Sequence, residues 1–99
     1  MIIHQRTFYC KVGHADSVVR LVKDFKRIAD AVGVRASTER VFTDLTGKND
    51  RVIWQIEVDR IADWEEAGPK FFGHPDFTGW FEQLTSHIDG SEAEFFTLQ

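Results

Sequence analysis

The chain has few of the residues that commonly mark special chemistry or an unusual cellular setting. Its 99 residues include one cysteine, Cys10, so no disulfide can form within the chain and a reducing cytoplasm is expected. Only two prolines are present, and no segment has the biased composition of a linker or a low-complexity region. No apolar run approaches the length of a membrane span, and the first residues lack the apolar core of a signal peptide. These absences predict one globular cytoplasmic domain over residues 1–99.

Positive charge and metal-binding spacings are also scarce. The chain contains 12 Lys and Arg residues and 16 Asp and Glu residues, which gives a net charge of −4. Binding to a nucleic-acid backbone needs a basic surface, so no nucleic-acid partner is expected. The four histidines are scattered, without a His-x-x-x-His or a cysteine pair, and no glycine-rich phosphate loop occurs. The sequence therefore predicts neither a metal site nor a cofactor.

Aromatic residues, by contrast, are abundant, at 13% of the chain. A small core does not easily hide so many rings, which favours a shared interface or an aromatic-walled pocket. They are densest over residues 71–81, which hold five aromatics. Apolar side chains then recur at helical spacing, which predicts a helix over residues 75–88 with Pro75 in its first turn. The apolar positions of this helix are Phe77, Trp80, Phe81, Leu84 and Ile88.

Periodicity and turn residues predict the other elements. An apolar stripe predicts a helix from Ala15 to Val32, ended by Gly33. A shorter helix is expected over 60–67, closed by Gly68 and Pro69. Strands are expected over 2–12, 34–46, 51–58 and 93–98, the last after a helix end at Gly90. The turn at 46–50 offers Gly47 and Asn49 for positive φ.

This order, β-α-β-β-α-β, predicts an α+β ferredoxin-like sandwich. Four antiparallel strands would form one sheet, with two helices on one of its faces. The other face would be open, yet the first strand is apolar on both sides. It carries Ile2, Phe8 and Val12 on one side and Ile3 and Tyr9 on the other. Both faces of the sheet are therefore expected to need cover.

The order of elements and one short motif resemble the dimeric α/β-barrel superfamily. Acidic residues, Glu57 and Asp59, end the third strand before a broken helical region, as they do in that superfamily. The segment from His74-Pro75-Asp76-Phe77 to Trp80 is similar to the HP-x-F-x-x-W phrase of its NIPSNAP-like and antibiotic-biosynthesis-monooxygenase-like branches. The resemblance covers the whole chain. It implies a homodimer whose two sheets pair face to face around a barrel cavity.

The resemblance leaves several activities open. The superfamily includes cofactor-free monooxygenases, haem-degrading enzymes, muconolactone-isomerase-like proteins and members without an assigned activity. The third strand here has no Asn and no Trp at its end, where the monooxygenase branch commonly has both. Where the haem-degrading branch has an Asn on its first strand, this chain has His4, Gln5 and Arg6. Trp64 and His74 could stand for that branch's Trp and His, although His74 precedes the helix and could simply shape its start.

The remaining ligand-binding candidates are polar or aromatic residues of the strands. His4 and Arg6 share one side of the first strand, where they either bind an anionic or carbonyl-bearing ligand or are solvated. Tyr9 and Trp54 either form a wall for a flat ligand or belong to the core. The side chains of Glu39, Gln55 and Glu57 either enter the cavity or form a polar rim. A carboxylate buried in the cavity could act as a base.

These observations lead to three functional hypotheses. The first is a cytoplasmic homodimeric barrel that binds an apolar or aromatic small molecule in a cavity between the two sheets. The second is an enzyme, a cofactor-independent monooxygenase or an isomerase, for which the sequence names no catalytic residue. The third is a non-catalytic module whose aromatic residues only hold the dimer together.

Overall fold

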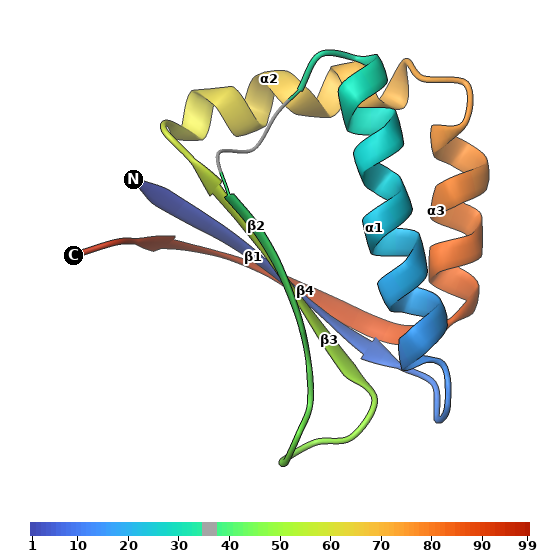
Figure 1. Ribbon diagram of the computed structural model, residues 1–99. Helices are drawn as coiled ribbons and strands as arrows, with labels where there is room; N and C mark the ends of the chain where they lie inside the picture. Colours follow the sequence, from blue (N-terminus) through green and yellow to red (C-terminus); the bar gives the residue numbers. More distant parts are fainter. Residues whose placement is uncertain (35–37) are drawn as a thin grey trace.

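The computed structural model describes residues 1–34 and 38–99. Four strands and three helices follow one another in these residues in the order β1, α1, β2, β3, α2, α3, β4 (Figure 1). Their bounds are β1 Ile2–Cys10, α1 Ala15–Ala31, β2 Thr38–Thr43, β3 Arg51–Val58, α2 Ile61–Phe72, α3 Phe77–Ser86 and β4 Ile88–Thr97. The predicted α+β ferredoxin-like arrangement is confirmed, and all three predicted helical segments are present, although the prediction placed only two helices on the face of the sheet.

The strands form one antiparallel sheet in the order β2-β3-β1-β4, which puts β1 and β3 at the centre. All three helices lie on the same face of this sheet (Figure 1). Helices α1 and α3 run side by side, and α2 crosses near one end of them (Figure 1). Within residues 1–34 and 38–99, the other face of the sheet carries no helix and is therefore bare in a single chain.

Helix α1 forms because its apolar side chains recur every three or four residues. The buried members of this stripe are Val18, Val22, Phe25 and Ile28. They pack on buried side chains of the two central strands, namely Phe8, Val52 and Trp54. The helix ends as predicted, because Gly33 takes a φ of 77°, a left-handed conformation that favours glycine.

The second helical region differs from the prediction. The short helix does not close at Gly68 and Pro69 but continues through both residues to Phe72. A proline within a helix forfeits one backbone hydrogen bond. That loss is tolerated here because the continued helix places Phe71 against Phe25, with ring centroids 4.8 Å apart. The next helix then starts at Phe77, later than predicted, with Pro75 in the preceding turn.

The strand ends also differ from the prediction. Strand β4 begins at Ile88, so Gly90 does not end a helix but pairs with Tyr9 within the sheet. Strand β2 covers Thr38–Thr43 only; residues 35–37 of the predicted strand lie outside the described residues. In the turn that follows β2, Gly47 takes a positive φ as predicted, but the second positive φ belongs to Asp50 and not to Asn49.

Strand register assigns each side chain to one face of the sheet. In β1, His4, Arg6 and Phe8 face the helices, while the alternate positions face the other way. Val12, expected on the same side as Phe8, lies beyond the end of β1 and is 90% exposed. We call the helix-free side the open face; its large apolar side chains are Ile3, Tyr9, Phe42, Ile53 and Phe96.

Candidate functional site

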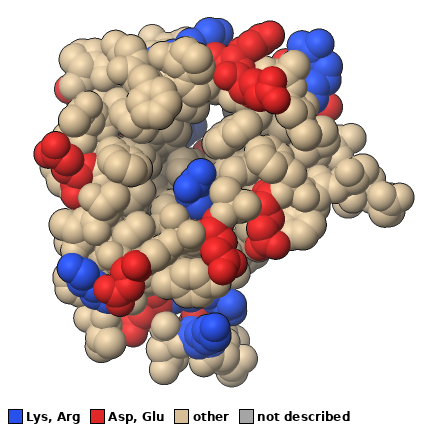
Figure 2. Space-filling model, turned by 180° about the vertical axis from the view of Figure 1, so that it is seen from behind, with Lys and Arg blue, Asp and Glu red and all other residues tan. Residues whose placement is uncertain are grey.

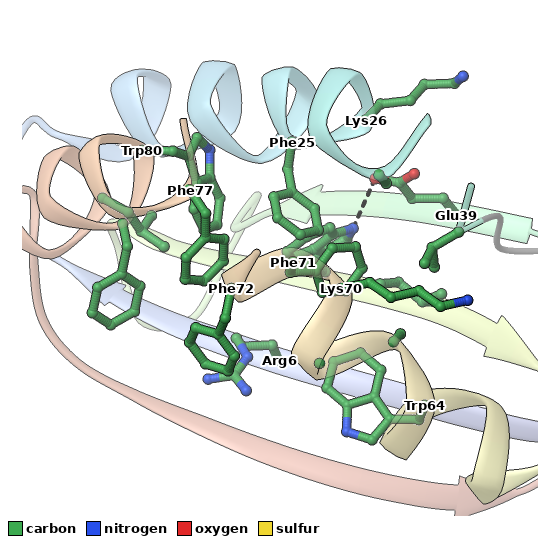
Figure 3. Close-up of a pocket in the computed structure, with 18 of the residues that line it drawn as sticks. Arg6, Phe25, Lys26, Glu39, Trp64, Lys70, Phe71, Phe72, Phe77 and Trp80 are labelled. Atoms are coloured by element: carbon green, nitrogen blue, oxygen red, sulfur yellow. Dashed lines mark hydrogen bonds between the residues drawn. The ribbon is translucent and has the colours of Figure 1, made fainter. Parts of the chain in front are cut away.

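A cavity of about 860 Å³ lies between the helices and the sheet. Strands β1 and β3 form its floor, and side chains from all three helices form its walls (Figure 3). The sequence predicted a ligand cavity between the sheets of two subunits. The inter-subunit cavity stays a prediction, and the cavity between helices and sheet lies within a single chain.

The cavity is roomy because strand β4 is covered only in part. The residues of β4 that face the helices next to β1 include Ser91 and Ala93, whose side chains are small and exposed. Phe72 of α2 and Phe81 of α3, which also line the cavity, are exposed as well. The cavity therefore opens toward β4. Figure 2 shows a hollow on this side of the molecule: most of its walls are uncharged, basic atoms lie inside it, and acidic side chains stand along its border.

Aromatic rings form most of the cavity's apolar surface. Phe25 of α1 is at the centre of this cluster, with its ring centroid 4.6 Å from that of Trp80 and 5.4 Å from that of Trp54. Trp80 is fixed in turn, because its indole N–H donates to the backbone carbonyl of Leu21 over 2.7 Å. Trp64 of α2 lines the cavity as well, so all three tryptophans of the chain border it. Such contacts hold the rings in place and preform an apolar wall.

Arg6 is the charged side chain in the floor of the cavity. It comes from the middle of β1, where its backbone lies between Trp54 of β3 and Ala93 of β4. Figure 3 shows its guanidinium group below Phe72, on the cavity side of the sheet. Burial lowers the pKa of Arg6 from its usual value. Within residues 1–34 and 38–99, no carboxylate lies within 4.0 Å of this guanidinium, and no side chain or carbonyl accepts a hydrogen bond from it.

The other charged residues of the cavity lie at its border, where most of them are exposed and several have partners. Lys26 pairs with Asp30 over 2.8 Å, and both side chains are exposed. Asp63 pairs with Arg60 over 2.9 Å. Glu39 accepts a hydrogen bond of 2.8 Å from the indole N–H of Trp54, which is drawn as a dashed line in Figure 3. Exposed pairs of this kind are well screened by water, so they contribute little charge to the interior.

His4 lies next to the cavity, beneath Trp64. It is 2% exposed, and its ring centroid lies 3.9 Å from that of Trp64 and 4.7 Å from that of Phe95. Burial, and secondarily the positive charge of Arg6, lowers the pKa of His4 to about 4, although a hydrogen bond to the backbone of Glu94 acts in the opposite direction. The ring is therefore neutral at pH 7. Its Nδ1 atom is buried and has no hydrogen-bond partner among the described residues.

The structure brings together only part of the predicted site. Arg6, Glu39 and Trp64 line the cavity, and His4 adjoins it. Tyr9 and Gln55 lie on the open face, on the opposite side of the sheet. The amide of Gln55 donates there to Gln5 over 2.8 Å, and the ammonium group of Lys48 lies 5.7 Å from the centre of the Tyr9 ring.

Of the two alternatives for Tyr9 and Trp54, the shared wall is excluded, because the two rings lie on opposite faces of the sheet, while Trp54 belongs to the core as the other alternative held. Glu57, the third strand candidate, also lies on the open face, where Arg40 pairs with it over 3.4 Å. Sequence spacing had shown that side chains alternate between two faces but not which face the helices would cover.

His74 occupies a different place, in the turn between α2 and α3. Its Nδ1 accepts a hydrogen bond from the backbone N–H of Asp76 over 3.0 Å, and its side chain is not part of the cavity lining. Asp76 also binds Arg27 of α1 over 2.7 Å, which ties this turn to the first helix. His74 therefore helps to shape the start of α3, one of the two roles that the sequence left open for it.

The sequence did not predict a contact between two other histidines. The Nδ1 atoms of His14, at the start of α1, and His87, at the end of α3, lie 2.8 Å apart. The contact could not be predicted from the sequence, because the two histidines are far apart along the chain and only the tertiary fold brings the two helix ends together. No group of three or more His, Cys, Asp and Glu residues that could hold a metal ion occurs among the described residues. In the same part of the chain, no helix is both long and apolar enough to cross a membrane.

Fold and cavity together define an α+β ferredoxin-like domain with a hollow between its helices and its sheet. Among solved structures, a NIPSNAP domain protein from Burkholderia xenovorans superposes with a TM-score of 0.83 at 14% identity, covering 100% of this chain and 95% of that one. A NIPSNAP family protein from Agrobacterium tumefaciens gives a TM-score of 0.82 at 18% identity, covering 99% and 92% of the two chains. An antibiotic biosynthesis monooxygenase gives 0.71 at 13% identity, covering 100% and 99%.

These similarities match the resemblance found in the sequence and show that the chain has the fold of NIPSNAP and antibiotic-biosynthesis-monooxygenase proteins. No protein-family model matches the chain, and no curated protein matches it significantly. Identities of this size show the fold alone.

Proposed function

We propose that this protein is a homodimer that binds an apolar or aromatic small molecule in the cavity of each chain. The observation that carries the proposal is the cavity itself, about 860 Å³ in volume and walled by rings from three helices and a strand. Ligand pockets in proteins commonly measure roughly 300–1,000 Å³ and combine apolar walls with a few polar groups. A cavity of this size next to ten core side chains is too large to be a packing defect.

A ligand-binding test can use the chain's own tryptophans, since all three border the cavity. We expect N-phenyl-1-naphthylamine, a neutral apolar dye, to bind and to quench tryptophan fluorescence by energy transfer. Ala29→Phe places a ring in the cavity and is expected to weaken binding at least ten-fold. Ala31→Phe is the matched control, because Ala31 lies on the same helix but is exposed and outside the lining. Equal affinity in both variants would contradict the proposal.

The open face supports the dimer. It presents five large apolar side chains, and Phe42 and Phe96 are each 44% exposed. Gln5 and Gln55 lie among them and can pair across an interface. A second copy of the chain fits this mixture of apolar and polar groups, since an interface core is apolar with satisfied polar groups around it. In sedimentation experiments, Phe42→Lys is expected to shift a dimer to monomer, whereas Phe72→Lys, on the cavity side, is expected to leave the dimer intact.

The cytoplasm is the proposed location. Cys10 is the single cysteine, and it is buried. Burial raises the pKa of its thiol to about 11, so the reactive thiolate is scarce at pH 7. Such a cysteine acts as a small apolar core residue and needs no oxidising compartment.

Catalysis is the alternative function, as a cofactor-independent monooxygenase or an isomerase. One observation favours it: the buried Nδ1 of the neutral His4 has no hydrogen-bond partner among the described residues, and the His4 ring packs against Trp64 of the cavity wall, so it could accept a proton from a ligand that displaces Trp64. Incubation with hydroxylated aromatic compounds and oxygen, followed by mass spectrometry, tests this function. Turnover that is lost in His4→Gln would establish it, while tight binding without turnover would favour the ligand-binding protein. A protein that binds no probe and still dimerises would instead be a structural module.

A further inference from the structure

The charges around the cavity are unevenly distributed between its floor and its border. At the border, Lys26, Asp30 and Asp63 are paired and solvated, and Glu39 is held by Trp54. In the floor, Arg6 is half-buried and has no carboxylate partner among the described residues. A cation that has lost part of its water without gaining a counter-ion is costly unless something else supplies the charge.

Neighbouring residues do not supply that charge. His4, the nearest titratable group on the same face of β1, is neutral at pH 7 and carries no negative charge. The positions that flank Arg6 across the sheet are Trp54 and Ala93, neither of which is charged. Nδ1 of His4 is the one fully buried side-chain polar atom without a partner among the described residues. The guanidinium nitrogens of Arg6 have no partner either, so they must be accessible to solvent in the cavity. Arg6 thus presents its donors to the cavity.

From this arrangement we infer that the ligand carries one anionic group of the carboxylate type, which Arg6 binds in the cavity floor while the apolar part of the ligand lies against the aromatic wall. This inference rests on the proposed ligand-binding function and adds the class of ligand: an apolar or aromatic monoanion. A guanidinium group matches a carboxylate with two parallel N–H···O bonds, and such charge-assisted bonds are among the strongest in proteins.

The border adds only a weak selection against a second charge. Its lining has four carboxylates, those of Asp30, Glu39, Asp63 and Glu66, and two cations, Lys26 and Lys70. A second carboxylate at the far end of the ligand would meet this negative balance, which water largely screens. Attraction at Arg6 therefore sets the preference for an anion, and the border disfavours a dianion only slightly.

The experiment measures displacement of N-phenyl-1-naphthylamine at pH 8 and low salt by two compounds of the same shape, biphenyl-4-carboxylate and biphenyl-4-methanol. We expect the carboxylate to bind at least ten-fold more tightly than the alcohol. In Arg6→Met this preference should disappear while the dye still binds. In Arg6→Lys, which keeps the charge but not the paired donors, the preference should be intermediate. Lys70→Met, which removes a cation of the border, is the matched control and should keep the full preference.

Each outcome has a distinct meaning. If the dye does not bind the unmodified protein, the proposed function fails. If the dye binds but both biphenyl compounds compete equally, or if Arg6→Met keeps the preference, the proposed function stands and the inference about Arg6 is overturned. Loss of the preference in Lys70→Met would overturn it as well. If Arg6→Met does not fold, Arg6→Lys and an NMR titration of the unmodified protein decide between these outcomes. A carboxylate bound at Arg6 should raise the pKa of His4, because it neutralises the positive charge of Arg6 that lowers this pKa. An unchanged pKa of His4 would refute the inference.

Discussion

Lowering the pH from 8 to 5 is expected to destabilise this protein through one buried side chain, His4. The folded chain holds His4 at a pKa of about 4, below the 6.5 of an unfolded chain. As the pH falls through 6.5, the unfolded chain takes up a proton that the folded chain does not. The stability that depends on neutral His4 is therefore fully present above pH 6.5 and is lost progressively toward pH 4.

The size of the effect follows from these two pKa values. At pH 5 the histidine of the unfolded chain is almost fully protonated, while His4 in the folded chain is still largely neutral. Proton linkage then lowers the free energy of unfolding by about 2 kcal/mol relative to pH 8, and by about 3 kcal/mol once the pH is below 4. A loss of 2 kcal/mol is a large fraction of the stability of a small domain.

Urea denaturation at a fixed protein concentration, at pH 8 and at pH 5, measures the effect. His4→Gln removes the titrating group, so the free energy of unfolding of this variant should fall by about 2 kcal/mol less than that of the unmodified protein between the two pH values. NMR titration of the His4 ring provides a direct check, with an expected midpoint near pH 4. The same loss in both proteins, or a His4 midpoint near 6.5, would refute the assignment of a buried neutral histidine.

Three further predictions concern stability and can be checked by urea denaturation at pH 8. Trp80→Phe keeps an aromatic ring but removes the 2.7 Å bond to the carbonyl of Leu21, and it is expected to cost about 1–2 kcal/mol. Asp44→Ala removes the carboxylate that accepts from both the backbone N–H and the guanidinium of Arg51, and a similar loss is expected; no loss would mean that this turn holds without the pair. Gly33→Ala forces a side chain into a left-handed conformation and should cost about 1 kcal/mol, and a stability gain would show that the C-terminus of α1 had relaxed.

Local patterns in the sequence predicted the regular elements well. The stripe from Val18 to Ile28 predicted α1 almost to the residue, and alternation in β3 gave its bounds as Arg51–Val58. Both elements lie at the centre of the fold, where local preference and burial favour the same structure. The order of elements was then enough to predict the sheet and the packing of the helices on one of its faces, but not which side chains of each strand lie on that face.

Predictions failed where long-range contacts outweighed local rules. Gly68 and Pro69 are strong helix-ending signals, yet α2 passes through them because Phe71 gains a place against Phe25. The site was predicted only in part for the same reason. Arg6 and Trp64 could be named as candidates, but nothing local shows that α2 would stand far enough from the sheet to leave a cavity between them.

Strand β4 has a consequence for how copies of this chain can meet. It is one of the two outer strands of the sheet, so the outward half of its backbone groups has no strand partner within the described chain. Exposed strands of this kind invite edge-to-edge pairing between molecules and, at high concentration, aggregation. Three carboxylates on β4, those of Asp89, Glu92 and Glu94, would be brought close together if two such strands paired. The acidity of this strand is thus a built-in barrier to growth of the sheet from one molecule into the next.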